Sequence, residues 1–159
     1  MTDGIAYAAG SNVMTSTLRF GDPTGLRFAF LADPLMQTSI SDIRLGSTAA
    51  NMFFNISMTD AKGAEVFSWS PDGAKGGIFG GTEDSDPFDL NYGITGNTIY
   101  DPIAGEFIAE TNVLSAGFYT LNIKMENQAN GTFVPIPAAA WLFGSGLIGL
   151  IGFARRKKA

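Results

Sequence analysis

The sequence predicts an all-β fold: a single antiparallel β-sandwich of jelly-roll-like topology over residues 1–133, followed by one C-terminal transmembrane helix. Apolar and polar residues alternate at a spacing of two, the period of a strand with one buried face. Turns rich in Gly, Asp and Pro separate these runs at short intervals. Helical periodicity is scarce before residue 138, and a long uncharged apolar stretch follows it.

The predicted strands are recognised by their apolar positions. In chain order these are Leu26, Phe28 and Phe30; Ile43 and Leu45; Met52, Phe54, Ile56 and Met58; Ala64 to Trp69; Phe88, Leu90, Tyr92 and Ile94; Phe107 and Ile108; and Tyr119, Leu121, Ile123 and Met125. Asp60-Ala61-Lys62-Gly63 has the composition of a hairpin turn. We expect residues 71–87, which are rich in Gly and Asp, to form a long surface loop. Residues 127–132 are polar and predict a turn or the start of a linker.

Composition excludes several classes of function. The chain has no Cys and no His, which removes disulfides, thiol nucleophiles and the commonest general base, and makes a Ser-His-Asp triad impossible. The formal net charge is −5, but residues 1–137 carry six basic and fifteen acidic side chains, a charge of −9. This charge disfavours nucleic acid as a partner and leaves cation binding open.

The amino terminus does not have the pattern of an export signal. Met1-Thr2-Asp3-Gly4 has no basic segment, and the apolar run from Ile5 to Ala9 is too short for a signal peptide. The carboxyl terminus nevertheless has the features of an exported protein. Either the reading frame begins late and a signal peptide lies upstream of Met1, or the protein is not exported; the features of the carboxyl terminus favour the late start.

Residues 134–159 predict a membrane-directed signal in three parts. The uncharged segment from Ala138 to Ala154 has 17 residues, and as a helix it is about 25 Å long, near the lower limit for a membrane span. Its central residues are Trp141, Leu142, Phe143, Gly144, Ser145, Gly146, Leu147, Ile148, Gly149, Leu150, Ile151, Gly152 and Phe153. A permanent one-pass anchor and a buried core helix are the alternative interpretations.

Two short motifs flank this span. Val134, Pro135, Ile136 and Pro137 precede it, and the prolines hold this stretch extended and accessible to a processing enzyme. A basic stop signal follows it, formed by Arg155, Arg156, Lys157 and Lys158. The basic residues place this end of the helix on the cytoplasmic side and residues 1–133 on the non-cytoplasmic side.

The segment VPIPAAAWLFGSGLIGLIGFARRKK (residues 134–158) resembles the PEP-CTERM sorting signal of exosortase substrates in Gram-negative bacteria. It is most similar to the variant with Val-Pro-Leu-Pro, a Trp-Leu-Phe-Gly-Ser-Gly-Leu core and an Arg-Arg-Lys tail, and Ile136 stands where the eponymous glutamate would be. Leu114 to Leu121 also resembles a strand that often closes the β-sandwich domains of these proteins. The resemblance implies export by the Sec translocon, transient retention in the inner membrane and recognition by an exosortase near the prolines. It also implies release or attachment at the cell surface, in association with exopolysaccharide and biofilm.

One acidic loop is a candidate metal site. Glu83, Asp84, Asp86 and Asp89 lie close together in a Gly-rich stretch, and carboxylate oxygens are the ligands that Ca²⁺ prefers. Their spacing does not match an EF-hand. A solvated acidic loop without a ligand explains the same pattern.

Other candidates concern sugar chemistry. Asp101, Glu106 and Glu110 could supply the paired carboxylates of a glycosidase, although their spacing does not single them out. Four aromatic residues could stack on sugar rings if they were exposed: Trp69, Tyr92, Tyr100 and Tyr119. The alternation pattern places Trp69, Tyr92 and Tyr119 in the core instead. We expect a non-enzymatic envelope or matrix protein that binds polysaccharide; a permanently anchored carbohydrate-binding module and a carboxylate-dependent glycosidase are the alternatives.

Overall fold

The computed structural model describes residues 4–41, 46–133, Phe143 and Ser145. Within these residues, every regular element of more than one residue is a β-strand, and the sheets are antiparallel. This confirms the predicted all-β class. The strands are β1 (Gly4–Phe20), β2 (Arg27–Ala32), β3 (Met36–Thr38), β4 (Gly46–Asp60), β5 (Glu65–Trp69), β6 (Ile78–Phe79), β7 (Gly81–Ser85), β8 (Gly93–Thr95), β9 (Thr98–Tyr100), β10 (Gly105–Thr111) and β11 (Gly117–Phe133).

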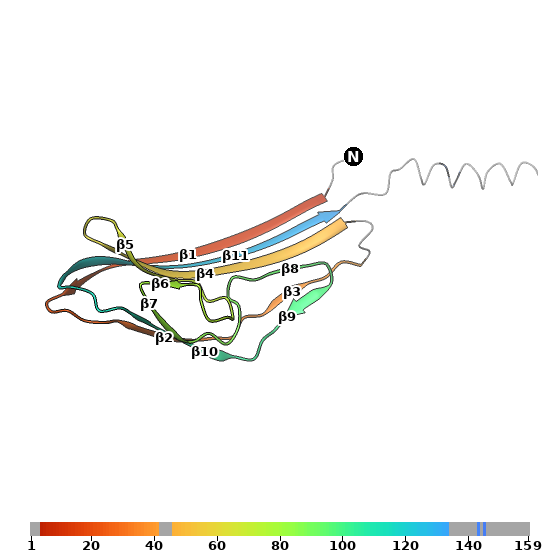
Figure 1. The fold of residues 1–159 in the computed structure, drawn as a ribbon. Helices are drawn as coiled ribbons and strands as arrows, with labels where there is room; N and C mark the ends of the chain where they lie inside the picture. The colour runs from red at the N-terminus through yellow and green to blue at the C-terminus, as the bar shows by residue number, and fades with distance from the viewer. Residues whose placement is uncertain (1–3, 42–45, 134–142, 144, 146–159) are drawn as a thin grey trace, which may run out of the picture.

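The strands form two layers and a small additional pair (Figure 1). The large sheet has the order β1-β11-β4-β5-β6, and β8 pairs with β4 beside it. The smaller sheet has the order β2-β10-β7, and β3 pairs with β9. The first strand therefore pairs with the last, and β2 pairs with the strand before the last.

Aromatic side chains hold the two sheets face to face. Phe28 of β2 stacks on Phe67 of β5 with 5.2 Å between the ring centroids. Phe30 of β2 contacts Phe54 of β4 at 4.9 Å and Trp69 of β5 at 5.8 Å. These contacts cross from one sheet to the other, so the two layers form a β-sandwich.

The core lies where the two sheets face each other, a region that we call the closed end. Phe67, Trp69, Phe107, Met58 and Ile56 are fully buried or nearly so there. They come from β4, β5 and β10, where alternation sends every second side chain inward. Burial of each large apolar side chain contributes roughly 1.5–3 kcal/mol, so the closed end carries most of the hydrophobic stabilisation.

The other end of the sandwich is built differently. β1, β11 and β4 run on side by side past the smaller sheet, as Figure 1 shows, with β3, β8 and β9 beneath them. Pairing continues without a shift to Phe133, which lies between Gly4 and Gly46. We call this extension, residues 4–12, 46–52 and 127–133, the open end.

Several predicted elements are present. The alternating runs after Leu26, Met52, Ala64, Phe107 and Tyr119 fall in β2, β4, β5, β10 and β11. In β4 the inward face carries Met52 and Met58, as the alternation requires. The predicted strand with Ile43 and Leu45 falls outside the described residues.

Three local predictions are wrong. Residues 127–132 are not a turn but the last part of β11, because their backbone pairs with both β1 and β4. Residues 71–87 do not form one long loop: β6 pairs with β5, and β7 pairs with β10. The alternation from Phe88 to Tyr92 does not form a strand, and extended pairing begins only at Gly93.

Candidate functional site

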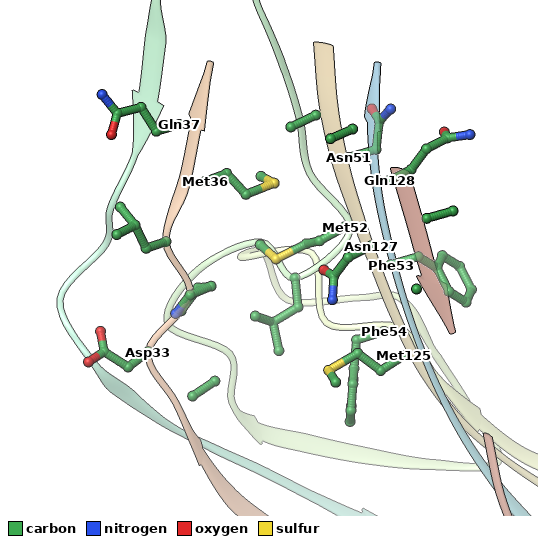
Figure 2. A pocket seen from close by; sticks show the side chains of 18 of the residues that line it. Asp33, Met36, Gln37, Asn51, Met52, Phe53, Phe54, Met125, Asn127 and Gln128 are labelled. Carbon is green, nitrogen blue, oxygen red and sulfur yellow. The ribbon is translucent and has the colours of Figure 1, made fainter. Parts of the chain in front are cut away.

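A cavity of about 770 Å³ lies between the layers where the closed end meets the open end. We call it the inter-sheet cavity. Figure 2 shows Met36 of β3 and Met52 of β4 facing each other across it. The apolar wall is completed by Phe54, Met125 and Leu90.

Strand alternation explains which side chains reach this cavity. Met52 pairs with Asn127 and Phe54 pairs with Met125 across β4 and β11, so these four side chains share one face of the sheet. Asn127 directs its amide into the cavity, whereas Gln37 and Asp33 point away from it (Figure 2). The result is a largely apolar cavity into which the Asn127 amide points.

The chemistry of the inter-sheet cavity favours binding over catalysis. Among the described residues that line it, Asp33 alone is titratable, and its side chain points away. A general acid and a general base must both lie within hydrogen-bond reach of a substrate. Methionine side chains adapt their shape to a ligand, so the cavity suits an uncharged, apolar guest.

A smaller groove of about 340 Å³ lies on the opposite face of β1, β11 and β4. We call it the outer groove, and it is lined by Tyr7, Ser11, Asn51, Phe53, Glu126 and Gln128. Alternation places these side chains outward because each is adjacent in sequence to a residue on the inner face. The outer groove therefore combines two aromatic rings with hydroxyl, amide and carboxylate groups.

Hydrogen bonds organise the outer groove. The Gln128 Nε2 donates to the Tyr7 hydroxyl at 3.1 Å, and the Ser11 hydroxyl donates to Glu126 Oε1 at 3.4 Å. Lys124 Nζ lies 2.9 Å from the same Glu126 oxygen and 5.4 Å from the centroid of the Phe53 ring. Tyr7 remains 63% exposed, so its ring is available to a ligand.

The predicted acidic residues lie in different environments. Glu83 and Asp84 are consecutive residues of β7 at a shift in its register with β10, and Glu83 is half-buried whereas Asp84 is exposed. Glu83 accepts the indole N–H of Trp69 and, at 3.1 Å, the amide of Gly76. Asp89 accepts the amide of Asn91 at 2.6 Å. Among the described residues no three His, Cys, Asp or Glu side chains are grouped as a metal site requires.

Asp86 is the most perturbed carboxyl of this loop. Its Oδ2 accepts the amides of Asp72 at 2.8 Å and Gly73 at 3.0 Å, whereas its buried Oδ1 has no hydrogen-bond partner. The pKa of Asp86 is raised to about 6, chiefly by burial and also by the neighbouring Glu83 carboxylate, against the opposing effect of the two backbone amides. These carboxylates thus fix the backbone of residues 72–76 by accepting its amides.

The predicted aromatic residues divide into buried and exposed sets. Trp69 and Tyr119 are buried as predicted, and the Tyr119 hydroxyl donates to the Ser115 carbonyl at 2.9 Å. The prediction of a buried Tyr92 is wrong, because the strand expected there does not form and the ring is 41% exposed. Tyr92 stacks on Tyr100 with 4.5 Å between the centroids, so this pair presents aromatic surface away from the outer groove.

The candidate glycosidase carboxylates do not form a close pair. Glu106 and Glu110 lie on the same face of β10 but four residues apart, which is about 13 Å at the rise of a strand. Paired glycosidase carboxylates lie roughly 5–9.5 Å apart. Glu110 also forms an ion pair with Arg27 at 3.6 Å, and Asp101 is exposed beyond the end of β9.

The predicted sorting signal lies almost entirely outside the described residues. Of residues 134–159, the structure describes Phe143 and Ser145, both exposed and in helical conformation. Two residues do not define a helix, and the described part of the chain contains no helix able to cross a membrane. The motifs before and after the predicted span therefore remain predictions.

Neither the outer groove nor the inter-sheet cavity follows from the sequence. Tyr7, Ser11 and Gln128 occur in segments without apolar alternation, and Met36 is brought to Met52 only by the tertiary fold. The spacing of two between Tyr7, Ala9 and Ser11 was the available signal, because it places the three residues on one face of a strand. The small residues around them obscured it, since they give no contrast between a polar and an apolar face.

Comparison with known proteins identifies no family. No protein-family model matches the chain, and no curated protein is significantly similar to it. The structure of the infectious bursal disease virus Gt strain is 14% identical over 87% of this chain and 43% of that chain, with a TM-score of 0.17. The VP2 subviral particle of infectious bursal disease virus is 11% identical over 98% of this chain and 50% of that chain, with a TM-score of 0.15. This chain spans half or less of those proteins, and likeness at these scores supports no functional assignment.

Proposed function

We propose that this chain is a non-enzymatic, exported protein of the cell envelope or extracellular matrix of a Gram-negative bacterium. The observation that carries the proposal is the segment from Val134 to Lys158, with its proline motif, apolar span and basic tail. In this proposal the Sec translocon exports the chain, and the span over 138–154 holds it transiently in the inner membrane. An exosortase cleaves it near Pro135 and Pro137, and the product reaches the cell surface or the extracellular space.

The position of the signal relative to the fold supports this order of events. β11 ends at Phe133, one residue before the proline motif, and its backbone pairs with β1 on one side and β4 on the other. Cleavage after β11 would leave these ladders intact. The nested pairing of β1 with β11 and β2 with β10 also supports a jelly-roll-like topology for the ectodomain. The transmembrane helix is a separate element of this proposal and rests on the sequence of residues 138–154.

Simultaneous replacement of Pro135 and Pro137 by Ala tests the sorting role. We expect the double variant to accumulate at full length in the membrane fraction, whereas the wild-type chain loses the mass of its tail. Replacement of Pro102, a proline of the sandwich, by Ala provides the control and should leave processing unchanged. If the double variant is processed like the wild type, the assignment of the motif is wrong.

The outer groove is where we propose that this protein binds a neutral polysaccharide. An exposed aromatic face packs against the apolar face of a sugar ring, and amide, hydroxyl and carboxylate groups bond to its hydroxyls. Tyr7, Gln128 and Glu126 supply these groups within one groove. The formal charge of −9 over residues 1–137 makes an acidic polysaccharide a poorer ligand.

Affinity electrophoresis in gels that contain exopolysaccharide tests this binding. We expect retardation of the wild-type chain and its loss in Tyr7→Ala, because the variant lacks the exposed ring. Tyr92→Ala removes an exposed ring outside the groove and should be retarded like the wild type. Equal retardation of Tyr7→Ala and wild type would remove the outer groove from the proposal.

Two alternatives make different predictions. A permanently anchored carbohydrate-binding module would keep residues 134–159, so the mature protein would retain their mass. A carboxylate-dependent glycosidase would release reducing ends from a glycan panel, which the separation of Glu106 from Glu110 along β10 disfavours.

A further inference from the structure

β1 is a long edge strand with an unpaired side. It spans Gly4–Phe20, 17 residues, and pairs with β11 along its whole length. Among the residues that the structure describes, no strand pairs with its other side. Every second residue of β1 therefore presents its N–H and C=O groups to solvent along that side.

This edge lacks the features that normally prevent pairing with another chain. Proteins protect exposed edges with charges, prolines, bulges or short strands. β1 has no charged residue before Arg19 and no proline, and its register with β11 continues without a shift. The opposite edge of the same sheet is β6, a strand of two residues (Ile78–Phe79). The exposure is thus specific to β1.

The side chains of β1 are also unusually apolar for a solvent-exposed strand. Residues 5–15 are all exposed. Ile5, Tyr7 and Val13 lie on the outer face at 74%, 63% and 60% exposure, and Met14 lies on the inner face at 51%. An exposed, uncharged and apolar edge of this length is a template for strand addition.

We infer that β1 pairs edge to edge with β1 of a second copy of this chain, antiparallel, with Ala9 on the two-fold axis. In this register Ile5 lies opposite Val13 of the other copy, and Tyr7 lies opposite Ser11. Each such pair occurs twice, and cross-strand apolar pairs stabilise a sheet by roughly 0.2–1 kcal/mol each. β1 carries no charged residue between positions 4 and 14, so no like charges face each other in this register.

A second copy is the partner that the chemistry of this edge favours. The edge requires an extended, uncharged strand of matching length. Within the described residues, β1 itself is the strand that is long, almost free of charge and unpaired on one side. Isologous pairing also closes the assembly, because it uses the free side of β1 on both copies. The pairing produces one continuous sheet and brings the two outer grooves next to each other.

The absence of Cys from the chain makes this pairing directly measurable. In Ala9→Cys the two thiols meet on the axis at the distance of a directly opposed cross-strand pair. We expect the full-length variant, purified in detergent and oxidised, to form a disulfide-linked dimer on non-reducing gels. Ser47→Cys is the matched control: Ser47 is exposed on the same outer face, but β11 and β1 separate it from the edge, so it should remain monomeric on the same gels.

A charged variant tests the same contact without a covalent bond. Ala9→Lys places two ammonium groups opposite each other, and sedimentation should show a dimer dissociation constant raised about tenfold or more. Ser47→Lys should sediment like the wild type. A wild-type chain that sediments as a monomer, or an Ala9→Lys chain that dimerises like the wild type, would overturn the proposal. The second outcome would assign association to another surface, such as the tail.

Discussion

The closed end and the open end of the sandwich are made from the same long strands but have opposite properties. Inward residues of β4 near its carboxyl end, such as Ile56 and Met58, are buried against Phe67 and Phe107. Inward residues nearer its amino end share their face with Ala129 and Asn127 of β11 and border a cavity. One sheet thus changes from core to binding surface along its length.

This difference indicates a division between stability and recognition. The closed end buries large side chains in contact with one another, whereas the open end exposes aromatic and amide side chains on one face and a cavity on the other. Changes at the closed end should therefore affect the free energy of unfolding, and changes at the open end should affect binding. Matched substitutions in the two regions test this division.

The largest contrast is expected between two methionines of the inner face. Met58→Ala leaves a void among fully buried residues and should lower the free energy of unfolding by about 2–5 kcal/mol. Met125 lies at the border of the open end, beside the inter-sheet cavity, and is 41% exposed. Met125→Ala should therefore cost less than about 1 kcal/mol. Urea denaturation of both variants measures the difference, and equal losses would contradict the division.

Two glycines provide the next contrast. Gly80 has a φ of +71°, and a Cβ there would collide with the Val66 carbonyl oxygen, so Gly80→Ala should cost roughly 2–3 kcal/mol. Gly10 has no atom within 4 Å of an added Cβ, and Gly10→Ala should change stability by no more than about 0.5 kcal/mol. Thermal unfolding followed by circular dichroism distinguishes the two; an unchanged Gly80→Ala would contradict the observed packing.

A smaller effect is expected from pH. The pKa of Asp86 is raised by burial from 3.8 to about 6 in the folded chain. Between these values the folded state retains a proton that the unfolded state has lost, so stability should fall as pH rises from about 4 to about 6. The loss is on the order of 1 kcal/mol, because solvent screens this partly exposed group.

The side chain introduced by Asp86→Asn cannot ionise. This variant should therefore lose the slope in the pH dependence of the melting temperature, the fall between about pH 4 and about pH 6. Asp84→Asn, a matched change at an exposed position of β7 two residues away, should retain the slope. A slope that persists unchanged in Asp86→Asn would exclude Asp86 as its source.

The smallest expected effect is that of Ca²⁺. The candidate Ca²⁺ ligands Glu83, Asp84, Asp86 and Asp89 have little capacity left for a cation, since Glu83, Asp86 and Asp89 already accept backbone amides. Millimolar Ca²⁺ should then raise the free energy of unfolding by less than about 1 kcal/mol. Calorimetry in the presence of Ca²⁺, with Mg²⁺ as the comparison, measures this shift; its absence would remove the site.

The closed end was predictable from the sequence and the open end was not, for a physical reason. Alternation reveals a strand when one face is buried, as in β4, β5 and the first half of β11. β1 carries exposed apolar residues on both faces, such as Val13 and Met14, and residues 127–132 are small or polar, so no one-sided alternation arises. Their strand structure comes from backbone pairing over long sequence distances.

The acidic segment illustrates the same limit. Gly81, Asp84 and Ser85 have low strand propensity, and the composition predicted a loop. Pairing with β10 and the bond from Trp69 to Glu83 hold the segment extended as β7. The residue types of the candidate metal site were readable from the sequence, whereas the partial burial of Glu83 and the exposure of Asp84 were not.

The central position of β11 has a consequence for the order of folding. β11 lies between β1 and β4, so the large sheet cannot assemble until the final strand has been synthesised. Such distant contacts make folding slow. In the export route proposed above, this delay would keep the polypeptide unfolded, and so able to pass through the translocon, until β11 has been synthesised.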